Sequence, residues 1–169
     1  MPIITTDIKF YLSGGAANAD VDAALGGVIS SVEITTATLH NLFDVVSSAE
    51  TSAGDIEYRC LYVKNTHGSL SLTSAAAWIS SNTPSGDTSA DIGLGSGAVN
   101  TTEQTVANES TAPSAVSFSA PANQGAGLAI GDIPAGATKA IWIRRTVSAA
   151  ASAYSNDTMT VNVGGDTAA

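Results

Sequence analysis

The feature that most constrains the fold is a series of short apolar runs separated by clusters of Gly, Asn, Asp, Pro and Ser. Runs of this length, rich in β-branched and aromatic residues and bounded by turn-forming residues, are typical of β-strands. No long segment has the periodicity of an amphipathic helix, which disfavours alternating β and α units. We predict strands at residues 8–12, 27–34, 56–64, 70–80, 91–94, 115–119, 127–130, 138–147 and 158–163. The sequence therefore predicts an all-β protein, a jelly-roll-like antiparallel β-sandwich with at most one short helical turn.

The length of the chain, 169 residues, suits a single domain, because a chain of this size buries roughly two-thirds of its unfolded surface. We find no repeat of fixed period and no linker that would divide the chain. Residues 8–169 are therefore predicted to form one β-sandwich domain. Residues 1–7 are predicted as an N-terminal arm, in which Pro2, Ile3 and Ile4 either pair with the sheet edge of a neighbouring protein or form a frayed end.

Alternation of side chains assigns faces within the strongest predicted strands. The face of residues 56–63 that we expect to point into the core carries Ile56, Tyr58, Cys60 and Tyr62. Asp55 and Glu57 are expected to face solvent at the start of this strand, and Arg145 is expected where the run 138–147 leaves the core. Residues 39–46 carry apolar side chains at i, i+3, i+4 and i+7 and predict the one short helical turn.

Charged residues are scarce and mostly acidic, with 6 Lys and Arg against 15 Asp and Glu and a formal net charge of −9. Such a charge repels phosphate backbones and anionic lipids, so we expect neither nucleic acid nor a membrane as a partner. Disordered chains combine high charge with low hydrophobicity, which this chain does not. No apolar run approaches the length of a transmembrane helix, and the first residues lack the features of a secretory signal. We therefore expect a protein made in the cytoplasm.

Candidate catalytic groups are few. Cys60 is the only cysteine, and His40 and His67 are the only histidines, so nucleophilic catalysis by a thiol would need one of these two pairs. The alternation around Cys60 favours a buried apolar role instead. His67 lies in the stretch Asn-Thr-His-Gly, which is typical of a hairpin turn. We therefore expect no enzymatic activity.

Two further patterns match known sites only in part. The spacing of Asn18, Asp20 and Asp22 is that of the opening of a calcium-binding loop, but the glycine at the sixth position and the glutamate at the twelfth are missing. The glycines of residues 93–97 do not complete a dinucleotide-binding motif, and we expect a bulge or turn there. The sequence predicts no metal and no cofactor.

Trp78 and Trp142 both lie in predicted strands. An exposed aromatic face on a β-sandwich can bind sugars, whereas large aromatic side chains also anchor cores and subunit contacts. We take both tryptophans as candidate partner contacts, together with Pro2, Ile3 and Ile4.

Two segments resemble structural proteins of tailed bacteriophage particles. They are residues 55–65, Asp-Ile-Glu-Tyr-Arg-Cys-Leu-Tyr-Val-Lys-Asn, and residues 131–145, which begin Gly-Asp-Ile-Pro-Ala-Gly and end Ala-Ile-Trp-Ile-Arg-Arg. Within this group the chain is similar to capsid cement or decoration proteins. The resemblance implies a non-enzymatic β-sandwich that binds the outside of the capsid, bridges neighbouring subunits and so stabilises the shell. The implied partners are the major capsid protein and further copies of this chain, in a homo-oligomer.

Two other functions stay open. A tail or baseplate module that binds a host-surface glycan would need Trp78 or Trp142 exposed beside acidic or amide groups. An enzyme would need Cys60 beside His40 or His67 in an open cleft. For a virion protein, the net charge of −9 favours the capsid exterior over a position facing DNA.

Overall fold

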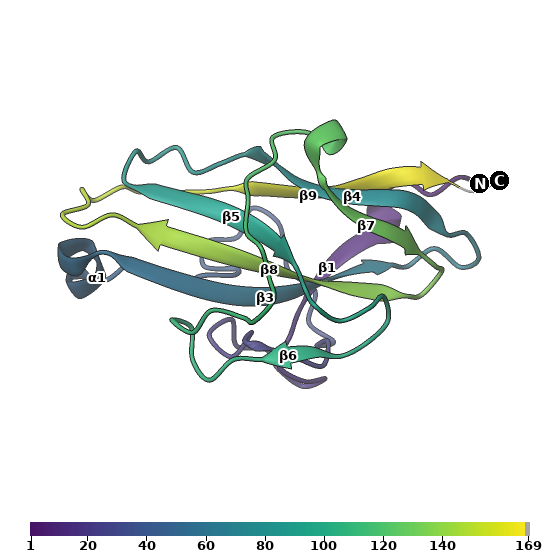
Figure 1. Cartoon of the computed structure of the whole chain (residues 1–169), viewed down its shortest axis with the longest axis horizontal. Helices are drawn as coiled ribbons and strands as arrows, with labels where there is room; N and C mark the ends of the chain where they lie inside the picture. Colours follow the sequence, from purple (N-terminus) through teal and green to yellow (C-terminus); the bar gives the residue numbers. More distant parts are fainter. Residues whose placement is uncertain (168–169) are drawn as a thin grey trace.

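The computed structural model describes residues 1–167 and is built almost entirely of β-strands (Figure 1). The strands are β1 (Ile8–Leu12), β2 (Gly26–Gly27), β3 (Asp55–Asn65), β4 (Leu72–Ser81), β5 (Thr88–Leu94), β6 (Glu103–Thr105), β7 (Leu128–Ile133), β8 (Thr138–Val147) and β9 (Thr160–Thr167). The helical segments are α1 (Ser48–Ala53) and two 3₁₀ turns, η1 (Thr5–Asp7) and η2 (Gln124–Ala126).

Two antiparallel sheets form a sandwich. One has the strand order β1-β3-β8-β5 and the other β7-β4-β9, while β2 and β6 pair in a small separate ribbon. From β3 onward, leaving aside the short β6, each strand lies in the sheet opposite to that of the strand before it. Connections that cross between the sheets are also a feature of jelly rolls. The predicted all-β antiparallel sandwich is confirmed.

The main core lies between the two sheets and is almost wholly aliphatic. The four-stranded sheet contributes Leu61, Val63, Ile92, Ile141 and Ile143, and the three-stranded sheet contributes Leu72, Ala75, Ala77, Ile79 and Ile133. Most neighbours within a strand are two positions apart because such side chains share a face of a strand, and a register irregularity in β4 lengthens the step between Leu72 and Ala75 to three. Full burial of each large aliphatic side chain contributes about 1.5–3 kcal/mol to stability, so this cluster is the main source of folding free energy.

A second, aromatic cluster covers the opposite face of the four-stranded sheet. Its buried members are Tyr58, Cys60, Tyr62, Val106, Ala140 and Trp142. Long loops and the ribbon of β2 and β6 lie over this face, and Figure 1 shows β6 on the side of β3 away from β4 and β9. Tyr58, Cys60 and Tyr62 are buried, as expected for a core face, but their cluster lies on the side of the sheet away from the main core between the two sheets. Both faces are buried, so alternation alone does not distinguish them, and Ile56 at the strand end is 44% exposed.

The predicted strands match the observed ones unevenly. β1 and β8 have the predicted bounds, whereas residues 115–119 contribute only a bridge between Ile92 and Ser119. Residues 27–34 form no long strand, because Gly26 and Gly27 both have positive φ angles and turn the chain. The following residues run beside β1 as irregular chain, with Leu12 N–H donating to Val32 O. β6 was not predicted, since its three residues carry no apolar alternation.

The helical turn predicted at residues 39–46 is absent, and α1 begins nine residues after the predicted start, at Ser48. Positive φ angles at Ala37 and His40 are unfavourable for a helix there. Ser47 instead forms a capping box with Glu50, which starts α1. Within residues 1–167, no helix is long and apolar enough to cross a membrane.

Candidate functional site: the groove beside strand β9

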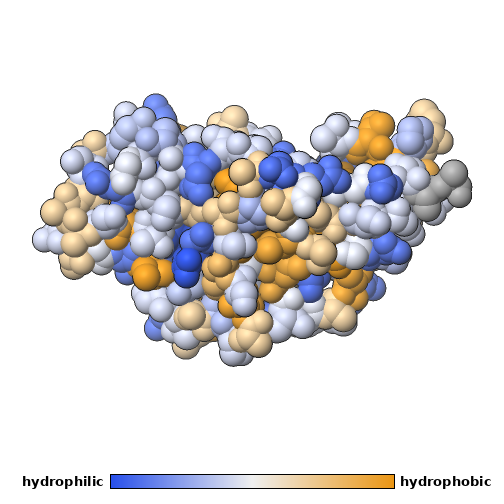
Figure 2. All heavy atoms as spheres, turned by 45° about the horizontal axis from the view of Figure 1, so that its top comes forward, coloured by the Kyte–Doolittle hydropathy of each residue, from blue (hydrophilic) through white to orange (hydrophobic). Residues whose placement is uncertain are grey.

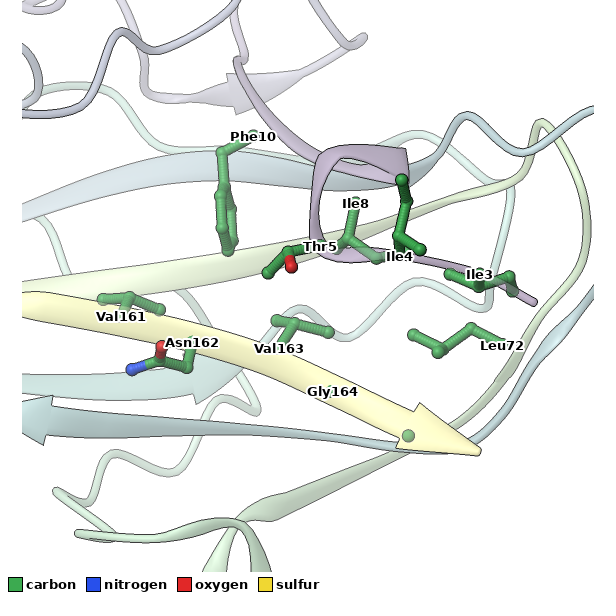
Figure 3. A pocket seen from close by; sticks show the side chains of 11 residues that line it. Ile3, Ile4, Thr5, Ile8, Phe10, Leu72, Val161, Asn162, Val163 and Gly164 are labelled. Carbon is green, nitrogen blue, oxygen red and sulfur yellow. The ribbon is translucent and has the colours of Figure 1, made fainter. Parts of the chain in front are cut away.

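An apolar groove lies between the N-terminal segment and β9 (Figure 3). Its volume is about 240 Å³. Ile8 and Phe10 line one wall and lie opposite Val161 and Val163 of β9 (Figure 3). Ile3, Ile4 and Leu72 close the end near the termini, so the groove is aliphatic along most of its length.

The groove lies along one side of the sandwich. There β1, an edge strand of the four-stranded sheet, lies opposite β9, an edge strand of the three-stranded sheet. β9 pairs with β4 on one side only, and no backbone hydrogen bond joins its outer edge to any other part of residues 1–167. β1 is the edge of the four-stranded sheet, but the chain around Val32 partly covers it. A free edge presents unpaired N–H and C=O groups to an incoming strand. The outer edge of β9 therefore combines backbone hydrogen-bonding groups with apolar side chains.

The N-terminal segment folds back against this groove. Ile4 O accepts a hydrogen bond from Asp7 N–H, and Asp7 Oδ2 accepts one from Ile4 N–H. Asp7 O accepts a further bond from Thr66 N–H. Ile3 packs against the main core, whereas Ile4 remains 55% exposed and Pro2 is exposed. The structure thus places two of the three predicted arm residues, Ile3 and Ile4, in the lining of the groove.

The two tryptophans occupy different environments. Trp142 is fully buried beneath the loops and offers no surface to a partner, which corrects its choice as a contact residue. Trp78 is half-buried on the outer face of the three-stranded sheet, where it pairs in register with Asn162 and packs over Gly164. Alternation along β4 turns Trp78 outward because Ala77 and Ile79 point into the core.

A buried ion-pair network lies near α1, where β3 begins and the neighbouring strand β8 ends. Arg145, with its side chain 12% exposed, pairs with Glu57, which is 1% exposed. Arg59 is fully buried and binds Asp22 at 2.9 Å and Glu109 at 2.6 Å. Burial raises the pKa of Glu57, although the ion pair with Arg145 opposes the shift. The expectation that Glu57 faces solvent is therefore wrong, whereas Arg145 lies near the end of β8, where burial decreases along the strand, as expected.

The aromatic ring of Phe43 supports this network from the loop that precedes α1. The guanidinium of Arg145 lies 4.7 Å from the ring centroid, and that of Arg59 lies 5.5 Å from it. Cation–π contacts of this kind stabilise a guanidinium that has lost water. Phe43 was predicted as part of a helical turn, but its function in the structure is to cover the two arginines.

A second buried pair of charges organises the glycine-rich loop after β5. Glu103 accepts hydrogen bonds from the backbone N–H groups of Ser96 and Gly97, and Lys139 donates to the carbonyls of Gly95 and Gly97. Burial alone would raise the pKa of Glu103, but the hydrogen bonds, led by that from Gly97, hold it below its ordinary value. The loop is a structural turn, as the sequence predicted.

The structure does not bring Cys60 and a histidine together. Cys60 is fully buried, and burial raises the pKa of its thiol, which disfavours the reactive thiolate. His40 is exposed on the loop before α1. His67 lies in a connection that crosses from β3 to β4 in the opposite sheet, so the expected hairpin is wrong, and its Nδ1 accepts hydrogen bonds from Ser69 N–H and Leu70 N–H.

The polar side chains of the acidic stretch around Asp20 accept hydrogen bonds from the backbone of the same stretch. Asn18 Oδ1 accepts a hydrogen bond from Asp20 N–H, and Asp20 Oδ1 accepts one from Asp22 N–H. Asp22 then turns to Arg59. These side chains point at their own backbone and at an arginine, and they do not surround a common point.

Comparison of the chain with protein-family models, curated proteins and solved structures found no match. The resemblance to phage structural proteins therefore rests on the two sequence segments alone. In the structure these segments are β3 and β8 with the turn before β8, which form the centre of the four-stranded sheet.

Proposed function

We propose that this protein is a non-enzymatic structural component of a phage virion, most simply a capsid cement or decoration protein. It binds the outer surface of the shell of major capsid protein and stabilises the joints between subunits. The observation that supports this proposal is the free edge of β9 beside an apolar groove. An edge of this kind is suited to a protein partner rather than to a small polar substrate.

The chemistry of the edge fits a contact between proteins. A strand added to β9 gains backbone hydrogen bonds, while every second side chain of that strand enters the groove between Ile8 and Val163. The groove residues carry no charge, so their burial involves little loss of hydration. The net charge of −9 favours the exterior of a particle that is filled with DNA.

The first test is the copy number of the chain in purified particles. A cement protein is present in a fixed ratio to the major capsid protein, because it occupies equivalent sites over the whole shell. Quantitative mass spectrometry of the particles measures this ratio. A few copies per particle would contradict the proposal and indicate a tail position instead.

The second test is a pair of matched variants. Ile4→Lys places a charge at the mouth of the groove, and Leu39→Lys changes an aliphatic side chain of similar exposure, 60% against 55%, that does not line the groove. We expect Ile4→Lys to weaken binding to shells that lack the protein by about tenfold or more, and Leu39→Lys to leave it unchanged. Equal binding of both variants would show that the groove does not take part in the contact with the shell.

A second candidate function is supported by the position of Trp78. Its indole lies on an open sheet face in register with the amide of Asn162, and an aromatic face beside an amide is a common way to bind a sugar ring. This candidate is a tail or baseplate module that binds a host-surface glycan. Binding on a glycan array that Trp78→Ala abolishes would favour it over the cement function.

A further inference from the structure

Three carboxylates converge at the end of the molecule opposite the groove. Glu50 of α1 and Asp55 and Glu57 of β3 each place one carboxylate oxygen within 4.8 Å of the others. Two oxygens that bind one Ca²⁺ ion at 2.3–2.6 Å stand at most about 5 Å apart. The separations in this cluster therefore fit three ligands of a single ion.

The buried oxygen of Glu57 is the second, independent observation. Glu57 is 1% exposed, and its Oε2 pairs with Arg145. Its Oε1 is also buried but has no hydrogen-bond partner. A buried, unpaired carboxylate oxygen costs on the order of 1–3 kcal/mol or more, so native structures rarely retain one without a role. The unpaired Oε1 is the oxygen of Glu57 that is available to an ion.

The charges around the cluster do not balance. Arg145 and Arg59 are already shared among Glu57, Asp44, Asp22 and Glu109. Within residues 1–167, neither Glu50 nor Asp55 forms an ion pair. Six carboxylates thus face two guanidinium groups, and a divalent cation would offset half of the excess negative charge.

The local fold holds the three side chains in place. The capping box fixes Glu50, whose Oε2 accepts a hydrogen bond from Ser47 N–H and leaves the other oxygen free. Gly54, with a φ angle of +78°, makes the sharp turn that brings α1 back over the start of β3. Asp55 and Glu57 share a face of β3 because they are two residues apart.

We propose that Glu50, Asp55 and Glu57 form a binding site for a divalent cation, and that the cation is Ca²⁺. All the ligand atoms are oxygens, which hard cations prefer, and Ca²⁺ accepts irregular sets completed by water. The ion joins α1 to the start of β3 and compensates the carboxylates that the two arginines leave unbalanced. This inference is independent of the proposed function, because the site lies away from the groove.

The test is isothermal titration of the full-length protein with CaCl₂ after treatment with EDTA. We expect one ion per chain, with a dissociation constant on the order of 10⁻⁴ to 10⁻³ M or tighter, which begins at the weak end of the range known for Ca²⁺ sites. Asp55→Asn keeps the shape of the side chain, and within residues 1–167 the carboxylate of Asp55 forms no ion pair that the substitution would break. We expect this variant to fold in EDTA and to bind Ca²⁺ at least about tenfold more weakly, because it removes one charged ligand.

The matched control is Asp166→Asn, which removes a charge from an exposed carboxylate on β9 at the other end of the molecule. We expect this variant to bind Ca²⁺ as the parent does. Thermal unfolding is a second measurement, in which Ca²⁺ raises the Tm of the parent and of Asp166→Asn but not that of Asp55→Asn. Absence of binding by the parent, or equal binding by Asp55→Asn and the parent, would overturn the proposal.

Discussion

Two buried charged clusters lie against the four-stranded sheet, and each contains a buried glutamate. The negative charge of that glutamate is compensated in a different way in each cluster. At one end of β3, Glu57 is compensated by the side chain of Arg145 and shares its surroundings with other acids. At the other, Glu103 is compensated by backbone N–H groups of the loop after β5, and Lys139 by carbonyls of the same loop. The first cluster leaves one carboxylate oxygen without a partner, whereas neither oxygen of Glu103 is left unpaired.

The difference shows in the opposite directions of the pKa shifts. Burial raises the pKa of Glu57 and is not overcome by its ion pair. At Glu103 burial acts in the same direction, but the hydrogen bonds from the loop overcome it and lower the pKa. Backbone donors are fixed by the fold and lose little entropy when they bind a carboxylate, while an arginine shared among several acids serves each of them only in part.

The largest expected effect comes from removing Arg145. Arg145→Ala leaves Glu57 buried without its counter-charge, and we expect a loss of about 3–5 kcal/mol in the free energy of unfolding. Urea denaturation measures this loss. The control is Arg144→Ala, since the Arg144 side chain is 32% exposed and pairs with Asp91 nearer the solvent.

Arg144→Ala should lower the free energy of unfolding much less, by on the order of 1 kcal/mol, because solvent screens its partly exposed ion pair. Adding Glu57→Gln to Arg145→Ala should recover part of the stability, since the buried charge is then gone. Equal losses for the two arginine variants would mean that Glu57 does not depend on Arg145.

A smaller effect is expected in the loop that holds Glu103. A Cβ atom at Gly95 would lie 2.3 Å from Glu103 Oε2 and 2.8 Å from Ala140 Cβ. Glu103 is fixed by its hydrogen bonds and cannot simply move aside, so we expect Gly95→Ala to destabilise the protein by about 1–3 kcal/mol. Gly68→Ala is the matched control, because a Cβ atom there meets nothing within 4 Å.

The free energy of unfolding of Gly68→Ala should stay within about 0.5 kcal/mol of that of the parent. If Gly95→Ala behaved in the same way, the loop would be free to rearrange and Glu103 would not be rigidly held. Chemical denaturation of the two variants side by side distinguishes these outcomes.

The sequence predicted the strands better than it predicted the charged clusters. The bounds of β8 were correct because turn residues flank a long run with clear alternation. Glu57 was assigned to the surface because a carboxylate at the start of a strand normally faces solvent. Its partners come from positions as distant as Asp44 and Arg145, and only the folded sheet brings them together.

The groove was not predicted, although the N-terminal segment that lines it was predicted as an arm. Ile3 and Ile4 carry an apolar, β-prone pattern that suggested an arm. Whether β9 lies at an edge or in the centre of a sheet depends on topology, which a strand's own residues do not encode. One signal for the cation site was present, because Ser47 and Glu50 have the spacing of a capping box that predicts the start of α1.

The smallest effect distinguishes the two buried glutamates by the sign of their pH dependence. The pKa of Glu57 is raised above the ordinary value of 4.5, so its contribution to stability is full below that value and is lost as the pH rises through the raised pKa. The pKa of Glu103 is lowered, so its contribution is full above the ordinary value and is lost as the pH falls through the lowered pKa. Urea denaturation in EDTA over an acid-to-neutral series measures both, and EDTA is needed because a bound cation would hold Glu57 ionised. As the pH rises, Glu57→Gln should gain stability relative to the parent and Glu103→Gln should lose it.

Trends of the same sign in both variants would show that the two clusters do not differ in the way their compensation suggests.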